Sequence, residues 1–215
     1  MQLFNSFEVV SADLRRVRIT EDSKATQIQS RFSFIDYQEL RMFQISYIPG
    51  PLQSLGYIRG IFRADIFSLL EQSNAEQDMA TAIDERVRQG QKLRDSSKQF
   101  DFIIHENAFR SRICSREQMI EQIESIKAFS NQPNIRVSIL PFRLNYLVLD
   151  VEPPQVSFDV FDSKLLILQG NVSAINVWHE ELITGYKQYF EKLKAIAISN
   201  ESLLPELDRI TSELE

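Results

Sequence analysis

The sequence predicts a mixed α/β fold (α+β mixed), with one parallel β-α-β unit, an antiparallel meander and flanking helices. Three observations support this fold class. An apolar strand at residues 100–104, a helix and a strand at 135–140 follow one another, which is typical of a right-handed parallel crossover. Period-two alternation at residues 156–161, followed by an apolar run at 165–168, indicates antiparallel strands. The composition, 43% apolar and 25% charged, is that of an ordinary globular protein.

Two regions are expected along the chain. Residues 1–44 should form an irregular, β-rich N-terminal arm, and residues 45–215 a single α/β domain. The arm contains turn-prone pieces between three strand-like patches, at residues 7–10, 16–20 and 27–35.

A Pro49-Gly50-Pro51 turn lies near the start of the domain. Proline fixes φ and lacks a backbone donor, so Pro51 can open a helix that begins near Leu52. Gly50 is expected to supply backbone freedom, including φ > 0. Gln53 would then lie near the helix N-terminus, where it could face a pocket.

Helical spacing predicts the remaining elements. A helix at about residues 76–94 should turn Ile83 and Val87 inward. Ser115 and Gln118 predict a capping box at the start of the helix between the parallel strands. Residues 174–178 should add a third meander strand, and two helices should end the chain. The expected apolar positions of the first helix are Leu55, Ile58, Phe62, Ile66 and Leu69.

Charge placement argues against several partners. Residues 151–215 hold five Lys and Arg against eleven Asp and Glu, whereas the rest of the chain is balanced. Because nucleic-acid binding relies on basic contacts to phosphates, we expect that the chain alone does not bind duplex DNA. No apolar run approaches the ~20 residues that span a bilayer, so no membrane association is expected. A lone cysteine, Cys114, and the lack of a signal peptide predict a cytoplasmic protein.

No cofactor, metal or catalytic residue is predicted. None of the six glycines forms a dinucleotide-binding or phosphate-binding loop. The two histidines, His105 and His179, and Cys114 lack the spacing of metal ligands. Cys114 lies between two arginines just before a helix start, which could lower its thiol pKa, but a small apolar filler is the favoured interpretation.

Several short motifs follow one another in the order and spacing of a known protein family. Over residues 45–206 the chain resembles a C-terminal domain of unknown function found in bacterial XRE-type helix-turn-helix transcription regulators, which are described as antitoxin-like. The helix-turn-helix module of those regulators is not matched, and residues 1–44 do not replace it. The order and spacing of the motifs carry the resemblance, and two of them are Ile48-Pro49-Gly50-Pro51-Leu52-Gln53-Ser54-Leu55-Gly56-Tyr57 and Pro133-Asn134-Ile135-Arg136-Val137-Ser138-Ile139-Leu140-Pro141.

This resemblance implies a non-enzymatic regulatory or sensor domain without its own DNA-binding module. Its partner would be a small companion protein or a small-molecule effector, and homodimer formation is left open. The alternative is a small cytoplasmic enzyme on a mixed α/β sheet that uses a cluster of His105, Glu106 and Cys114.

Binding groups collect beyond the carboxyl ends of parallel strands, which here are followed by His105-Glu106 and by Pro141-Phe142. Two interpretations of Glu106 stay open. The favoured one is an internal ion pair, with Arg86, Arg88 and Arg110 as candidate partners. In the other interpretation, Glu106, His105 and Phe142 line a site that binds a ligand or a partner. Gln53 is a further candidate residue for that site. Structural roles are expected for Pro49, Gly50, Pro51, Pro133, Asn134 and Pro141.

Overall fold

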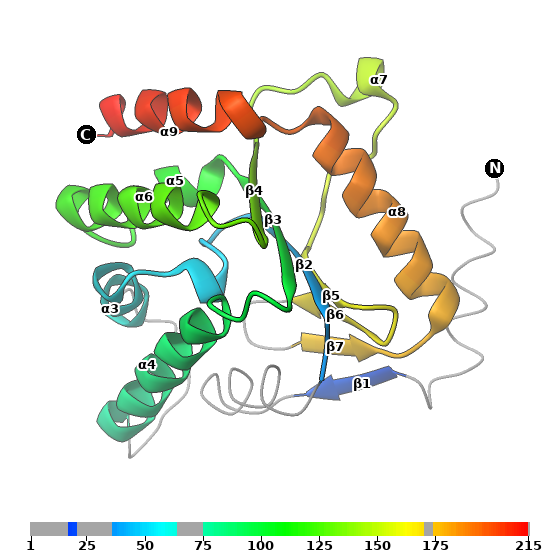
Figure 1. Ribbon diagram of the computed structural model, residues 1–215, viewed down its shortest axis with the longest axis horizontal. Helices are drawn as coiled ribbons and strands as arrows, with labels where there is room; N and C mark the ends of the chain where they lie inside the picture. The colour runs from blue at the N-terminus through cyan, green and yellow to red at the C-terminus, as the bar shows by residue number, and fades with distance from the viewer. Residues whose placement is uncertain (1–16, 21–35, 64–74, 170–173, 215) are drawn as a thin grey trace.

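A computed structural model describes residues 17–20, 36–63, 75–169 and 174–214 of the protein. A mixed β-sheet forms the centre of the protein. The strand order is β1-β7-β6-β5-β2-β3-β4 (Figure 1). The predicted fold class is therefore confirmed. The strands are β1 (Val17–Thr20), β2 (Glu39–Gln44), β3 (Gln99–His105), β4 (Ile135–Leu140), β5 (Ser157–Phe161), β6 (Leu165–Gln169) and β7 (Ala174–Val177).

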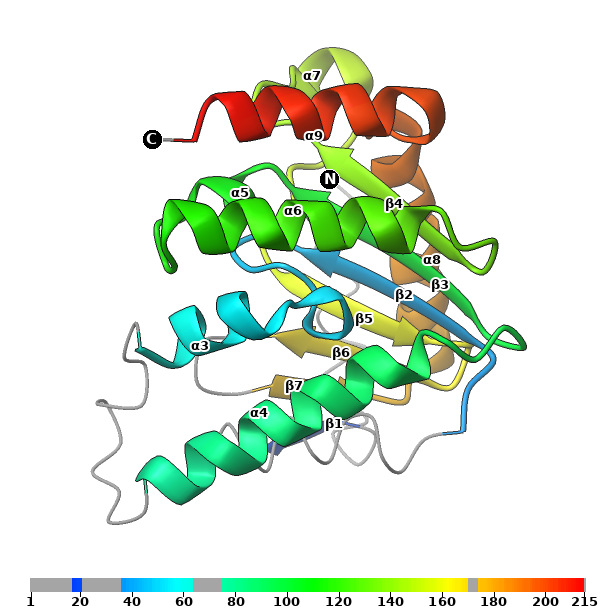
Figure 2. The ribbon, with the colours of Figure 1, turned by 60° about the vertical axis from the view of Figure 1, so that its left-hand side comes forward.

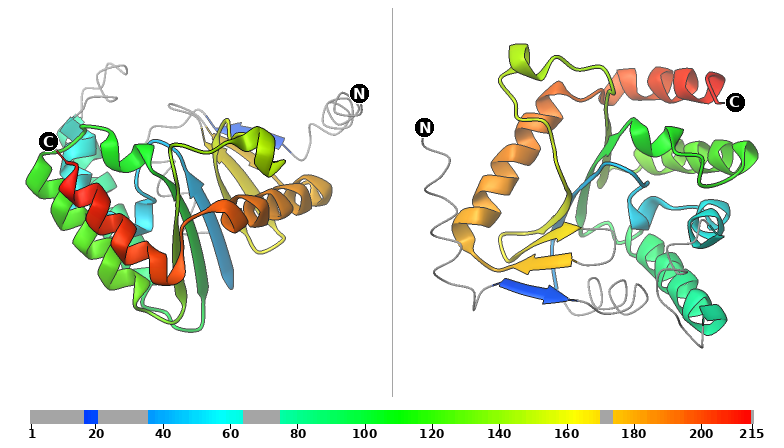
Figure 3. Two further views of the ribbon diagram at one scale, coloured as in Figure 1. Left: turned by 90° about the horizontal axis from the view of Figure 1, so that it is seen from above. Right: turned by 180° about the vertical axis from the view of Figure 1, so that it is seen from behind.

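Helices cover both faces of this sheet. One face is covered by α3, α4, α6 and α9, and the other by α8 (Figures 1 and 3). Figure 2 shows α6 and α9 side by side over the β3–β4 end of the sheet. The helical segments are η2 (Gly50–Leu52), α3 (Leu55–Arg63), α4 (Ala75–Lys92), α5 (Asn107–Arg110), α6 (Arg116–Ser130), α7 (Tyr146–Leu149), α8 (Glu180–Ile196), η4 (Asn200–Ser202) and α9 (Leu203–Ser212).

The predicted β-α-β crossover is present, because β3 and β4 are parallel and α6 lies between them in the chain. The capping box at its start is confirmed as well. Ser115 Oγ accepts a hydrogen bond from the Gln118 N–H, and Gln118 Oε1 accepts one from the Ser115 N–H, so each side chain satisfies an otherwise unpaired donor.

The position of strand β2 corrects the prediction that residues 1–44 form an irregular arm. It lies in the middle of the sheet, parallel to β3 and antiparallel to β5, so residues 39–44 are part of the sheet core rather than of a loosely attached arm. Strand β1 falls within the second strand-like patch and pairs with β7. The patches at 7–10 and 27–35 lie outside the described residues.

The Pro-Gly-Pro turn is a short 3-10 segment rather than the first turn of the following helix. Segment η2 ends at Leu52, and α3 begins only at Leu55. The turn is closed by side chains, since Gln53 Nε2 donates to the Ile48 carbonyl at 2.7 Å and the Ile48 N–H donates to Tyr57 Oη at 3.0 Å. The helix start predicted near Leu52 was therefore three residues early.

Gly50 does not adopt a positive φ, so the expected reason for a glycine there was wrong. The reason lies in a close approach by α4. A Cβ atom on Gly50 would lie only 1.8 Å from Nη1 of Arg86 and 3.0 Å from Oε1 of Gln89. Glycine leaves room for the Arg86 guanidinium, which donates to Gln89 Oε1 at 3.1 Å.

Helix α4 turns a polar face toward η2. Glu85 and Gln89 are buried, whereas Val87, which was expected to face inward, is 43% exposed. Leu55 of α3 is also exposed, while Ile58 is buried. Ile66 and Leu69 lie outside the described residues. The apolar spacing therefore predicted the existence of both helices. It did not predict which face of α4 is buried.

We predict that Gly50→Ala lowers the free energy of unfolding by about 1–3 kcal/mol, because the added methyl group displaces the Arg86 guanidinium from its bond to Gln89. Gly185→Ala is the matched control. Gly185 lies in α8 with open space around its Cα, so alanine should raise stability by about 0.5–1 kcal/mol. Chemical denaturation measures both changes. Equal effects of the two substitutions would contradict the packing argument.

Candidate functional site

The carboxyl ends of β3 and β4 lie side by side, as predicted from the crossover. His105 is in register with Leu140, and the Glu106 N–H donates to the Leu140 carbonyl at 2.9 Å. The residues that follow the two strands, Glu106 and Phe142, are consequently brought together at this edge of the sheet.

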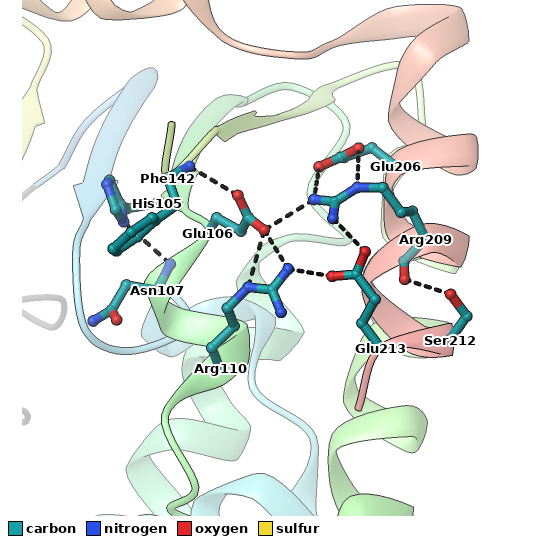
Figure 4. Close-up of polar contacts among 9 residues, drawn as sticks. All are labelled: His105, Glu106, Asn107, Arg110, Phe142, Glu206, Arg209, Ser212 and Glu213. Atoms are coloured by element: carbon teal, nitrogen blue, oxygen red, sulfur yellow. Dashed lines mark hydrogen bonds and ion pairs between the residues drawn. The ribbon is translucent and has the colours of Figure 1, made fainter. Parts of the chain in front are cut away.

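Glu106 is buried, and four hydrogen bonds satisfy its carboxylate (Figure 4). Oε2 accepts from the Phe142 N–H at 2.8 Å. Oε1 accepts from Arg110 Nε at 3.0 Å and Nη2 at 2.5 Å, and from Arg209 Nη2 at 2.9 Å. The internal ion pair with Arg110 is thus confirmed, because the carboxylate has two cationic partners.

The other two arginines proposed for Glu106 lie elsewhere. Arg86 bonds to Gln89, and Arg88 forms an ion pair with Glu85, with 3.6 Å between Nη1 and Oε2. Arg209, which sequence reasoning missed, comes from α9, 103 residues along the chain. The sequence offered one indication that Arg209 pairs with a carboxylate. Arg209 is one of only five basic residues in the acidic region 151–215.

Two acidic residues of α9 and its C-terminal end complete the network. Glu213 accepts from Arg110 Nη2 at 2.6 Å and from Arg209 Nη1 at 2.7 Å. Glu206 accepts from Arg209 Nη2 at 2.6 Å. Figure 4 shows how these contacts connect α5, which follows β3, with α9. We call Glu106, Arg110, Glu206, Arg209 and Glu213 the Glu106 network.

The network determines the ionisation of Glu106. Burial by itself would raise its pKa, but the hydrogen bonds from the Phe142 N–H and the two arginines outweigh burial and lower the pKa from 4.5 to about 2. The pKa of Arg209 is raised by its bonds to Glu206, Glu106 and Glu213. Glu106 is therefore an anion at neutral pH with its strong acceptor positions already occupied, which makes it a poor general base.

His105 is fixed beside Phe142. Its Nδ1 accepts from the Asn107 N–H at 3.1 Å, which assigns the proton of the neutral ring to Nε2. The ring centroids of His105 and Phe142 are 6.2 Å apart in an edge-on arrangement. Burial lowers the pKa of His105, while the charge of Glu106 opposes this effect. His105 is therefore neutral at pH 7.

In the part of the chain that the structure describes, no hydrogen bond or ion pair joins Gln53 or Cys114 to this edge. Gln53 serves the η2 turn, and its buried Oε1 has no hydrogen-bond partner among the described residues. Cys114 packs against α3, where a Cβ on Gly60 would lie 2.6 Å from its own Cβ, and burial raises its thiol pKa. Among the described residues, no hydrogen bond links Cys114 to His105 or Glu106 as a nucleophile and its base would be linked.

The remaining motif residues hold the ends of β4. Asn134 is buried, and its Nδ2 donates to the carbonyl oxygens of Leu93 at 3.2 Å and Asp95 at 3.1 Å. This amide fastens the loop after α4 to the start of β4. Pro133 precedes Asn134 in the turn, and Pro141 follows the last residue of the strand.

Residues 141–156, which we call the 141–156 segment, connect β4 to β5 and carry α7. The segment is fastened at several points. The Phe142 N–H binds Glu106, Val151 is buried, and Tyr189 Oη of α8 donates to the Glu152 carbonyl at 2.8 Å. Asp150 ends α7 in the left-handed region, with φ at 51°.

Large apolar side chains are nevertheless exposed along this segment. Phe142 is 61% exposed and Val148 76% exposed, and Leu149 and Val156 are exposed as well. A held backbone that presents apolar side chains to solvent is typical of an interaction surface. The described residues contain no group of three His, Cys, Asp or Glu that could hold a metal ion. Among their helices, none has the length and apolar character needed to cross a membrane.

These features define a mixed α/β domain that exposes apolar side chains in the segment following the parallel strand β4. Residues 38–204 match the family described as a domain of unknown function, DUF5753, and the chain belongs to this family. No curated protein matches the chain.

The comparison with solved structures gives matches at low sequence identity. Nuc from Salmonella typhimurium, a phospholipase D family member, is 11% identical, with a TM-score of 0.46 over 86% of this chain and 98% of that one. NucT from Helicobacter pylori is 13% identical, with a TM-score of 0.39 over 82% and 87%. TrmBL2, an archaeal chromatin protein, is 8% identical, with a TM-score of 0.42 over 93% and 63%. At these values none of them informs function.

We predict that Glu106→Gln lowers the free energy of unfolding at pH 7 by about 2–4 kcal/mol, because it leaves two arginines without their buried anion. The folded-state pKa is depressed, so the stabilisation by Glu106 is present above pH 4.5 and is lost as the pH falls toward 2. The difference between the variant and the wild type should therefore shrink over that interval.

Thermal unfolding across this pH range measures the effect, and Glu121→Gln, at an exposed position of α6, is the control. The assigned ion pair would be contradicted if the stability difference between Glu106→Gln and the wild type stayed constant down to pH 2. It would also be contradicted if Glu121→Gln had the same effect on stability as Glu106→Gln.

Proposed function

We propose that this chain is a non-enzymatic, cytoplasmic regulatory domain that binds a small companion protein through the exposed apolar side chains of the 141–156 segment. The observation that supports it best is the exposure of Phe142 and Val148 on a segment that Glu106 holds at the Phe142 N–H and Tyr189 holds at the Glu152 carbonyl. Such pre-organisation lowers the entropic cost of binding.

The family resemblance supports the regulatory context. The motifs resemble the C-terminal domain of antitoxin-like XRE-type transcription regulators, which are often encoded beside a small companion protein. In this proposal the domain supplies the regulatory part of such a system, and a separate helix-turn-helix module supplies DNA binding. That this chain alone does not bind duplex DNA stays a prediction from its charge distribution.

Charge indicates what the partner should look like. The segment carries exposed Asp150 and Glu152 next to its apolar residues, and the chain from residue 151 onward is acidic. A partner segment with apolar anchors and flanking Lys or Arg residues would complement this surface. Apolar anchors would supply most of the affinity, and the charges would mainly affect the association rate.

An enzymatic role receives no support from the geometry of the site. Glu106 is occupied by two arginines, His105 Nδ1 accepts from the Asn107 N–H, and the pKa of Cys114 is raised rather than lowered. General acid–base or nucleophilic chemistry needs a titratable pair within hydrogen-bond reach, and these three residues do not form one.

We predict that the purified chain forms a complex with the purified product of the neighbouring reading frame, and that the double variant Phe142→Ser, Val148→Ser weakens it at least tenfold. Both side chains are largely exposed, so the double variant should keep its melting temperature. Isothermal titration calorimetry measures the affinity. Val87→Ser, which removes an exposed valine of α4 outside the 141–156 segment, should bind like the wild type.

The proposal is wrong if the neighbouring product does not bind the wild-type chain. The placement of the surface is wrong if the double variant binds normally while Val87→Ser binds poorly.

A further inference from the structure

Charged and polar side chains are buried on the α8 face of the three parallel strands. Arg41 of β2 and Asp101 of β3 are in register with each other, and Ser138 of β4 is in register with Ile103. Their sequence neighbours belong to the core on the opposite face, so alternation directs these three side chains toward α8. Asp101 and Ser138 are more than nine-tenths buried.

Arg41 and Asp101 do not pair with each other. Arg41 Nη2 lies 2.8 Å from Glu39 Oε1, and Arg41 Nε lies 3.4 Å from Glu191 Oε1 without hydrogen-bond geometry. Asp101 Oδ2 instead accepts a hydrogen bond from Lys194 of α8. Arg41 and Asp101 are therefore adjacent on neighbouring strands, but each contacts a different charged partner.

Several buried atoms of this cluster lack hydrogen-bond partners among the described residues. They are Nε and Nη1 of Arg41, Oδ1 of Asp101 and Oγ of Ser138. Buried polar groups are normally satisfied, so three unsatisfied side chains on adjacent strands require an explanation. Together they offer donors, an acceptor and a hydroxyl group that can act as either.

The charges indicate which ligand would fit. Arg41 and Lys194, with Arg136 in register beside Asp101, balance Glu39, Asp101 and Glu191. An anion would be repelled by Asp101, and a cation by Arg41. A neutral group that both accepts and donates hydrogen bonds would satisfy Arg41 and Asp101 at once.

We propose that the unsatisfied polar atoms of Arg41, Asp101 and Ser138, on the α8 face of strands β2–β4, bind a small neutral molecule that carries a donor and an acceptor on adjacent groups, as primary amides and vicinal diols do. Arg41 donates to its acceptor, Asp101 Oδ1 accepts from its donor, and Ser138 Oγ adds a further bond. Glu191 and Lys194 of α8, whose side chains are 54% and 26% exposed, contact Arg41 and Asp101 and would have to move aside for the molecule to enter. This site goes beyond the proposed partner surface, and neither depends on the other.

Amide-detected NMR titration of the labelled full chain tests the site. The probes are nicotinamide as a primary amide and myo-inositol as a vicinal diol, with sodium sulfate and putrescine as an anion and a cation. At least one neutral probe should give saturable shifts at Arg41, Asp101 and Ser138. The two ions should give none, and the Phe142→Ser, Val148→Ser variant should respond like the wild type.

Ser138→Ala separates a ligand site from a structural role. Because the hydroxyl is buried and unpaired, its removal should leave the melting temperature unchanged or higher, while probe affinity falls at least fivefold. Ser125→Ala on α6 is the control and should alter neither.

Three results would overturn the proposal. One is the absence of saturable shifts with both neutral probes, which would indicate ordered water only. Another is saturable binding of sulfate or putrescine at these residues. The third is a lower melting temperature of Ser138→Ala with unchanged probe affinity.

Discussion

The carboxylate of Glu106 joins three parts of the molecule that are distant in sequence. It lies just beyond β3, accepts from the backbone that follows β4, and binds an arginine of α9. A buried anion is costly without partners, and here Arg110 and Arg209 supply the countercharge while the Phe142 N–H supplies a further donor. The position of α9 and the start of the 141–156 segment therefore depend on one ionised group.

This constraint links the fold to the proposed function. Exposed apolar side chains on a loose loop would pay a large ordering cost on binding, whereas a segment fixed at Phe142, Val151 and Glu152 has already been ordered by folding. The second proposed site, at Arg41 and Asp101, lies under α8 instead. A domain with a partner surface and a separate ligand site would have the two sites that allosteric regulation requires.

Local patterns predicted most of the fold but not its long-range contacts. The crossover and the Ser115 capping box were predictable because each depends on residues close in sequence. Strand β2 was missed because Glu39 and Arg41 interrupt its apolar pattern, although the strand is central. Arg209 was missed because nothing local connects it to Glu106, and the buried polar face of α4 was missed because periodicity favours apolar faces.

Hydrogen exchange at the Phe142 amide tests the central claim most directly, because this N–H donates to Glu106. We expect the amide to be protected in the wild-type chain, although the Phe142 side chain is largely exposed. Arg209→Ala should accelerate its exchange at least tenfold while Ile103, in the middle of β3, stays protected. Exchange of the Phe142 amide at the rate of an unstructured peptide in the wild type, or no response to Arg209→Ala, would contradict the account.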